Sequence, residues 1–153
     1  QHPGTPGNWH ALYQATDATL LAKAMVWMAT DASCANQAFN ITNGDLIRWE
    51  NLWPQIAAYW GMQTGARRQI NLTRIMADKA PVWDRIVQRH GLVANRYEDV
   101  VSWPYGDFVF TPEFDIISDT GKCRQFGFYE FADTGQMFFK LWDQYRQAKI
   151  LPG

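Results

Sequence analysis

The sequence has few cysteines, no long apolar run and no excess of charge of either sign. Its two cysteines, Cys34 and Cys123, match no metal-binding or redox spacing. We therefore expect free thiols and a reducing, cytoplasmic location. Fourteen basic residues stand against fifteen acidic ones with no run of like charge, so we expect neither nucleic acid nor a membrane surface as a partner. Charges such as Lys23 and Arg48 interrupt every apolar stretch, and none approaches the roughly 20 residues of a membrane span.

Motifs for dinucleotide binding, hydrolysis and metal binding are also missing. The glycines do not form the pattern G-x-x-G-x-x-G, and no close glycine pair lies between a strand and a helix of a βαβ unit. There is no Gly-x-Ser-x-Gly, and no group of His, Cys, Asp or Glu has the spacing of metal ligands. The sequence therefore predicts no catalytic, cofactor-binding or metal-binding residue in this chain.

One pair does have the spacing of a catalytic motif. Tyr145 and Lys149 stand four residues apart, as in the Tyr-x-x-x-Lys of dehydrogenases, in which the ammonium lowers the pKa of the phenol. The pair lies at the end of the chain with no nucleotide-binding unit before it, so we interpret its spacing as a coincidence. For His90, before Gly91, we expect a helix C-terminus. His10 has two interpretations, a substrate-facing loop or the surface.

Aromatic residues are abundant. Eight of the 153 residues are Trp, and 47% of the chain is apolar, which suffices for one core and one domain over residues 1–153. Packing in the core is the simplest interpretation of most individual rings. Their number nevertheless exceeds what a small core needs, so we expect some to face a ligand, a missing half or another copy of the chain.

The pattern of apolar residues predicts a mainly helical chain with a few short strands. Residues 37–62 are the most informative segment, with a strand at 38–41, a turn at Asn43-Gly44 and a helix entered near Trp49 and stopped at Gly61. No regular structure is expected over residues 2–7 or 102–107. Further helices are predicted at residues 17–30, 72–78, 81–90, 97–101 and 134–149. We expect Asp17 to be a helix cap, Asp45 a turn residue and Asp107 a local hydrogen-bond acceptor.

Several of these phrases occur in the same order in one family. They are Asn40-Ile41-Thr42-Asn43-Gly44 before the Trp-containing helix, residues 16–22, the Pro-Val-Trp-x-x-Ile-Val of residues 81–87, Tyr105-Gly106-Asp107 and the Lys-Ile-Leu-Pro of residues 149–152. Together they resemble the C-terminal, substrate-binding half of extended short-chain dehydrogenases/reductases, and most closely the progesterone 5β-reductase/iridoid synthase-like group. The resemblance covers nearly the whole chain and is loosest at residues 65–71 and 108–122. Pro104 departs from the usual Trp of the family.

The resemblance implies an α/β fragment that lacks the nucleotide-binding parallel sheet. The chain begins Gln-His-Pro-Gly without an initiator Met, which also fits a fragment. By resemblance the parent is an NADPH-dependent oxidoreductase that reduces an activated C=C bond of an enone, or a carbonyl. Its N-terminal Rossmann half, which would bind NADP(H) and carry the catalytic Tyr and Lys, is then the partner of this chain. We expect no turnover from the 153 residues alone.

The same resemblance points to substrate-binding residues in two regions that are far apart in sequence. They are Trp9, Tyr13, Gln14, Trp103 and Tyr105. Rings with one polar atom suit a small apolar substrate that carries a carbonyl group. For Trp9 and Trp103 an equally good interpretation is that they brace their loops, whereas for Tyr105 we favour the pocket.

Two other classes of function stay open. A nucleotide-sugar epimerase or dehydratase would share the Asn-Ile-x-x-Gly unit and would need basic residues for a diphosphate, for which Arg67 and Arg68 are available. An exposed pair of charges is the simpler interpretation of these arginines. The third possibility is a free-standing helical binding module.

Overall fold

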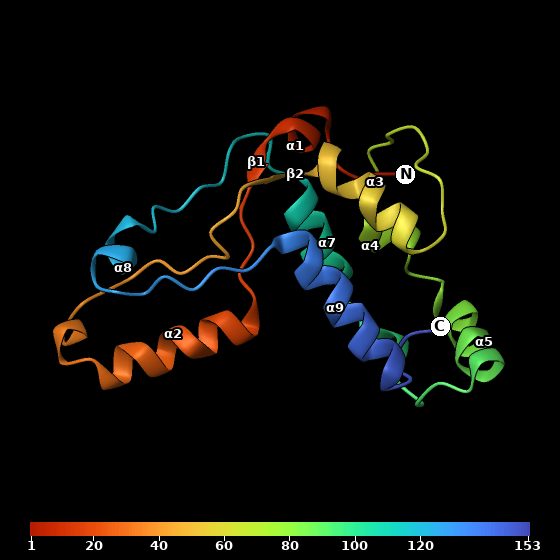
Figure 1. The fold of residues 1–153 in the computed structure, drawn as a ribbon. Helices are drawn as coiled ribbons and strands as arrows, with labels where there is room; N and C mark the ends of the chain where they lie inside the picture. The colour runs from red at the N-terminus through yellow and green to blue at the C-terminus, as the bar shows by residue number, and fades with distance from the viewer.

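The computed structural model describes all 153 residues and is mainly helical (Figure 1). Two strands of two residues each pair antiparallel, with Leu12 opposite Arg48 and Tyr13 opposite Ile47. No helix is both long and apolar enough to cross a membrane. The elements in chain order are α1 (Pro6–His10), β1 (Leu12–Tyr13), α2 (Ala18–Thr30), the 3-10 turn η1 (Ala32–Cys34), β2 (Ile47–Arg48), α3 (Trp49–Tyr59), α4 (Leu72–Ile75), α5 (Ala80–His90), α6 (Tyr97–Val100), α7 (Trp103–Phe110), α8 (Gly121–Gln125) and α9 (Thr134–Gln147).

The helices form two groups, which extended segments of chain connect (Figure 1). One group contains α2, η1 and α8, and the other contains the remaining helices. Backbone hydrogen bonds join three of the connecting segments, because Asn43 donates to the carbonyl of Ala15 and Ala132 donates to that of Asn43, both at 2.9 Å. The segments therefore run side by side without forming a regular sheet.

The smaller group has its own core under α2. Asp17 caps this helix as expected, since its carboxylate accepts from the Leu20 N–H at 2.8 Å. Leu20 and Ala24, one turn apart, are buried against Cys123 and Phe128. Leu21, the next residue after Leu20, lies outside this core and is 40% exposed. Two further apolar residues of the uncovered side of α2, Met25 and Val26, are also exposed.

The larger group is held together by aromatic rings. The fully buried His2 ring lies within 4.9 to 6.0 Å of the ring centroids of Trp9, Trp49, Trp53 and Phe110. Where α3 meets α9, a second cluster contains Tyr59, Trp60, Phe138, Phe139 and Trp142. Trp49 is buried in the first cluster, whereas the other Trp residues of both clusters are only partly buried and pack against neighbouring rings.

The segment around Asn43 and Gly44 contains the predicted turn but not the predicted strand. Gly44 has φ +96° and Gly61, directly after α3 and Trp60, has φ +64°, so both positions need glycine. Residues 38–41 are not a strand, because no neighbouring segment makes a ladder of hydrogen bonds with them. The helix does begin at Trp49, and its buried side includes Trp49 and Leu52.

The side chain of Asn43 joins three elements at the centre of the molecule. It is fully buried, its oxygen accepts from the Asp17 N–H at 2.6 Å, and its amide donates to the Thr134 hydroxyl at 3.0 Å. The carboxylate of Asp45, expected as a turn residue, accepts from both the N–H and the hydroxyl of Thr134, at 2.8 and 2.7 Å. These contacts fix the starts of α2 and α9 relative to the turn.

Two segments that were expected to be irregular are helical. Helix α1 begins at Pro6, with Thr5 as its cap, and α7 occupies the predicted loop at residues 102–107. In α7, Pro104 lies in the first turn, where its missing N–H costs nothing. Other helices end earlier than predicted, since α4 stops at Ile75 and α9 at Gln147.

Candidate functional site

The two regions that carry the predicted substrate-binding residues lie next to each other. The Asn8 amide donates to the carbonyls of Val109 and Pro112 at 3.1 and 3.0 Å. The Ile116 N–H donates to the carbonyl of Leu12 at 2.9 Å. Segments about a hundred residues apart in sequence therefore form one surface, on which residues of α1, β1 and α7 can act together.

Tyr13 and Tyr105 are the two predicted residues whose phenols lie in one neighbourhood. Tyr13, on β1, is half-buried with its ring 6.1 Å from that of Trp49. Tyr105, on α7, is 63% exposed and lies beside Phe108, which is 69% exposed. Burial raises the pKa of Tyr13, and the nearby Tyr105 phenol raises it further. Tyr13 therefore stays protonated and can donate a hydrogen bond to an acceptor on a ligand.

Gln14 holds a neighbouring segment in place. Its side-chain oxygen accepts from the Ser118 N–H at 2.6 Å, which ties residues 116–118 to the end of β1. This bond uses one acceptor and leaves the amide group of Gln14 available for other partners. In this structure Gln14 therefore holds residues 116–118 against the end of β1.

Trp9 and Trp103 brace the protein on other sides. The Trp9 ring contacts His2 edge-on, with centroids 4.9 Å apart, and the Arg67 guanidinium lies 5.8 Å above it. Trp103 packs near Tyr97, with ring centroids 6.0 Å apart. Residues two apart on a helix point about 200° apart, so Trp103 and Tyr105 lie on opposite sides of α7. Of the five predicted residues, the structure thus places Tyr13 and Tyr105 in one neighbourhood, whereas the Gln14 side chain contacts residue 118.

Three residues near this surface were not predicted from the sequence. Trp49 lies behind Tyr13, and Phe108 extends the apolar surface beside Tyr105. His2 lies deeper, and its Nδ1 accepts from the Gly4 N–H at 3.2 Å. Burial, then the charges of Arg67 and the N-terminus, lowers the pKa of His2 to about 4, so its ring is neutral at pH 7. No sequence signal distinguishes this His from an exposed one.

The close approach of the chain around His2 explains why position 4 is a glycine. A Cβ on Gly4 would lie 2.6 Å from the His2 ring and 2.8 Å from the carbonyl oxygen of Phe110. No larger residue fits there without moving the backbone of α7. The position of Gly4 thus fixes the distance between the start of the chain and the helix that carries Tyr105.

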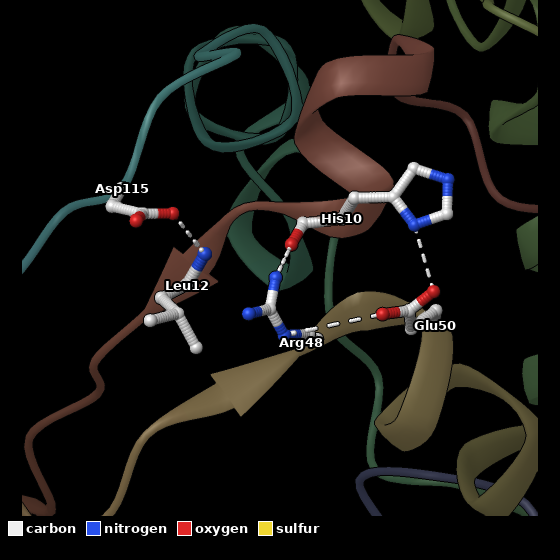
Figure 2. A network of polar contacts seen from close by, with 5 residues as sticks. All are labelled: His10, Leu12, Arg48, Glu50 and Asp115. Carbon is white, nitrogen blue, oxygen red and sulfur yellow. Dashed lines mark hydrogen bonds and ion pairs between the residues drawn. The ribbon is translucent and has the colours of Figure 1, made fainter.

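A network of polar contacts supports the surface from its exposed edge (Figure 2). Arg48 donates to the carbonyl of His10, and His10 Nδ1 lies 2.7 Å from Glu50 Oε2. On the other side, the Leu12 N–H donates to Asp115 Oδ1 at 2.8 Å. The His10 side chain is 58% exposed and paired with Glu50, so the structure places it at the surface. Exposed pairs of this kind contribute at most about 1 kcal/mol each.

The chain provides neither a dehydrogenase pair nor a cradle for a dinucleotide. Lys149 lies beyond α9 with φ +55°, so it does not share a helix face with Tyr145. The two antiparallel strands form no βαβ unit, the element in which Rossmann folds hold a dinucleotide. No three His, Cys, Asp or Glu side chains gather where they could hold a metal ion.

Comparison with known proteins identifies the family. Residues 1–152 match the family described as the PRISE-like Rossmann-fold domain, and the chain belongs to this family. It is 34% identical over 153 residues to an (S)-8-oxocitronellyl enol synthase of Nepeta cataria, covering 98% of this chain and 39% of that protein. It is 30% identical over 155 residues to the (S)-8-oxocitronellyl enol synthase of Catharanthus roseus, covering 99% and 40%.

These findings confirm the resemblance to the progesterone 5β-reductase/iridoid synthase-like group. A third relative, the (S)-8-oxocitronellyl enol synthase of Antirrhinum majus, is 33% identical over 154 residues. The chain spans about two fifths of the length of these relatives.

Proposed function

We propose that the chain is the C-terminal, substrate-binding portion of an NAD(P)H-dependent reductase of the extended short-chain dehydrogenase class. The observation that carries this proposal is the surface on which Tyr13 and Tyr105 lie, formed by segments that are about a hundred residues apart in sequence. It joins a protonated phenol to exposed aromatic rings, and it lies on segments held together by Asn8. Membership of the PRISE-like family supplies the reaction class.

The remaining part of the enzyme would be an N-terminal Rossmann half. The chain covers 39% of the length of its Nepeta relative and has no strand-loop-helix unit for a dinucleotide. In the proposed enzyme, NADP(H) and the catalytic Tyr and Lys therefore belong to the other half, and residues 1–153 form one domain beside it. Both cysteines are buried free thiols, which suits the proposed cytoplasmic location.

In this proposal the residues of the chain bind and orient the substrate. The Tyr13 phenol donates a hydrogen bond to the substrate carbonyl, because its raised pKa keeps the proton on the oxygen. Tyr105 and Phe108 contact the apolar part of the substrate and exclude water from it. Contact with the other half would bury these two rings further, which favours association through the hydrophobic effect.

The proposed substrate is a small apolar molecule with a carbonyl group, such as an enone. The names of the relatives specify an oxo-substituted citronellyl skeleton, which belongs to this class of compound. The surface around Tyr13 has the matching chemistry, with one phenol donor beside Trp49 and apolar rings on α7. We propose that the enzyme reduces an activated C=C bond or the carbonyl itself.

Two rival functions remain testable. A nucleotide-sugar epimerase or dehydratase would need cations at the site, but Arg67 lies over Trp9, on a ring that braces His2. A free-standing binding module would need no second half.

The decisive assay is NADPH oxidation by the full-length protein with a panel of enones and nucleotide sugars. The proposal predicts NADPH consumption with at least one enone or apolar carbonyl compound, and none with a nucleotide sugar. Turnover of a nucleotide sugar without NADPH consumption by any enone would contradict it.

A further inference from the structure

Residues 38–42 resemble a strand that has no other strand beside it. They run as an extended segment from η1 toward the centre of the molecule (Figure 1). Phe39 and Ile41 pack on the core under α2, whereas Ala38 and Asn40 are exposed. The side chains thus alternate as they do on a strand with one buried face. We call these residues the 38–42 segment.

The backbone of the 38–42 segment is nearly without partners. None of its N–H and carbonyl groups bonds to another backbone group. Only two of its carbonyl oxygens have side-chain donors, Ala38 from Lys122 at 3.0 Å and Ile41 from Thr16 at 3.1 Å. Open backbone groups on an extended segment are a template for pairing with another extended chain. The chemistry of the segment therefore selects a polypeptide strand as its partner.

A second segment, residues 126–132, runs beside the first one in the same direction. The rings of Phe39 and Phe126 lie 5.2 Å apart, and further along both segments the Ala132 N–H donates to the carbonyl of Asn43. Between these two points no backbone hydrogen bond joins the segments. A common direction is typical of the strands of a parallel sheet, whose faces are covered by helices.

Helix α2 also has more apolar surface than its core covers. Leu20 and Ala24 form the row of side chains that packs on the core beside the 38–42 segment. Leu21 and Met25, one turn apart in the adjacent row, are 40% and 59% exposed. A helix that covers a sheet packs its apolar face against several strands. The exposed row can therefore cover a further strand beside the 38–42 segment.

We propose that the 38–42 segment becomes a strand in the full-length enzyme by pairing with a strand of the N-terminal half. The chain matches a Rossmann-fold family and covers 39% of its Nepeta relative, yet it has no parallel strand of its own. The pairing forms the strand that the sequence predicts, and Leu21 and Met25 then lie over the joined sheet. This inference rests on the proposed function, which supplies the second half, and it names a surface where the two halves meet.

Hydrogen exchange in the full-length protein, followed by mass spectrometry, tests the pairing. Amides paired in a sheet exchange only when the strand opens. The 38–42 segment should therefore exchange at least about a hundredfold more slowly than an unfolded chain of the same sequence. Residues 63–67 are the internal control, because none of their backbone N–H groups is bonded, and they should exchange rapidly.

Two substitutions on α2 test its position over the joined sheet. Met25→Glu places a charge where the proposal puts the sheet, so it should speed exchange of the 38–42 segment at least about tenfold. Thr19→Glu adds the same charge at an exposed position on a different side of α2, and it should leave this exchange unchanged. The exchange of the wild-type protein decides the pairing even if Met25→Glu fails to fold.

Three results would overturn the proposal. The first is that the 38–42 segment exchanges as fast as residues 63–67 in the full-length protein. The second is an equal effect of Met25→Glu and Thr19→Glu, which would remove the sheet from under α2. The third is protection that is lost when a dimer is diluted to monomers, which would assign the segment to a second copy of the chain.

The exchange measurement is independent of turnover. Rapid exchange of the 38–42 segment in a protein that oxidises NADPH with an enone would refute the pairing and leave the proposed reductase function standing. Slow exchange in a full-length protein without this activity would support the pairing and contradict the proposed function.

Discussion

Trp103 and Tyr105 stand two residues apart on α7 and point to opposite sides of this helix. Trp103 packs toward α5 and α6, where it walls an apolar pocket, whereas Tyr105 is 63% exposed beside Tyr13. One short helix therefore contributes to two surfaces with different chemistry. Helix α4 fixes its orientation, since a Cβ on Gly106 would lie 2.9 Å from Leu72.

Replacing Tyr105 with Ala should change substrate use more than stability. The exposed ring contributes little to folding, so the free energy of unfolding should change by less than about 0.5 kcal/mol. In the full-length enzyme, KM should rise or the order of preferred substrates should change. Tyr129→Ala, which removes a 76% exposed ring from the other group of helices, is the matched control. An unchanged substrate profile would remove Tyr105 from the site.

Asn43→Ala should strongly destabilise the chain. It removes the acceptor of the Asp17 N–H at a fully buried position, and a buried group left without a partner costs about 1–3 kcal/mol. The Thr134 hydroxyl loses the Asn43 donor but keeps its bond to Asp45. Urea unfolding should show this loss as a lower midpoint. Asn51→Ala, at an exposed position of α3, is the control and should stay within about 0.5 kcal/mol of wild type. Equal midpoints for the two variants would show that the Asn43 contacts contribute little.

His2 should make stability depend on pH between its two pKa values. The pKa of His2 is about 4 in the folded chain and 6.5 as its ordinary value. The unfolded chain thus binds a proton first as pH falls, so stability is complete above 6.5 and decreases toward pH 4, by about 3 kcal/mol.

Two measurements check the His2 prediction. NMR titration of the wild-type chain should give His2 a pKa well below 6.5. His2→Gln should flatten the pH dependence of urea midpoints between pH 4 and 6.5. A His2 pKa near 6.5 in the folded chain would contradict the buried, neutral ring.

Asp107 caps α4 from a distance, so Asp107→Asn should loosen the packing of α4 on α7. Its carboxylate accepts from the N–H groups of Leu72 and Thr73 at 2.6 and 3.0 Å, and from the Thr73 hydroxyl at 2.6 Å. Burial alone would raise the pKa of Asp107, but these hydrogen bonds outweigh it and leave the pKa below 3.8.

The Asp107 substitution should cost about 1 kcal/mol at pH 7, the usual contribution of a helix cap. Because the folded pKa is lowered, this contribution is present above pH 3.8 and is lost as pH falls below it. Urea unfolding at pH 7 measures the cost, with Asp84→Asn on the exposed side of α5 as control. No difference between the two variants would remove Asp107 as a stabilising cap.

The sequence predicted the elements that are determined by local chemistry. Asp17 at the start of α2, Gly61 after α3 and Gly91 after α5 act through their own backbone geometry, which a short stretch of sequence specifies. A strand at residues 38–41 would instead need a neighbouring segment that pairs with it through backbone hydrogen bonds. No segment of the folded chain lies in that position. Helix α7 was predicted as an irregular segment, and its packing on α4 stabilises the helix although it contains Pro104 and Gly106.

The site was predictable to a similar extent. The family resemblance pointed to the two regions of Tyr13 and Tyr105, and the structure brings them together. The resemblance could not assign Trp103 and Tyr105 to different surfaces. Their opposite orientation follows from a helix that the sequence did not predict. The burial of His2 could not be predicted from the sequence either, since it depends on four rings from three helices, α1, α3 and α7.

The central claim is that these residues are one portion of a longer reductase, and the intact mass of the natural protein tests it most directly. The chain has a mass of 17.6 kDa and corresponds to 39% of its Nepeta relative, so mass spectrometry of the protein purified from its source should give about 45 kDa. A protein of 17.6 kDa translated from its own start codon would contradict the claim.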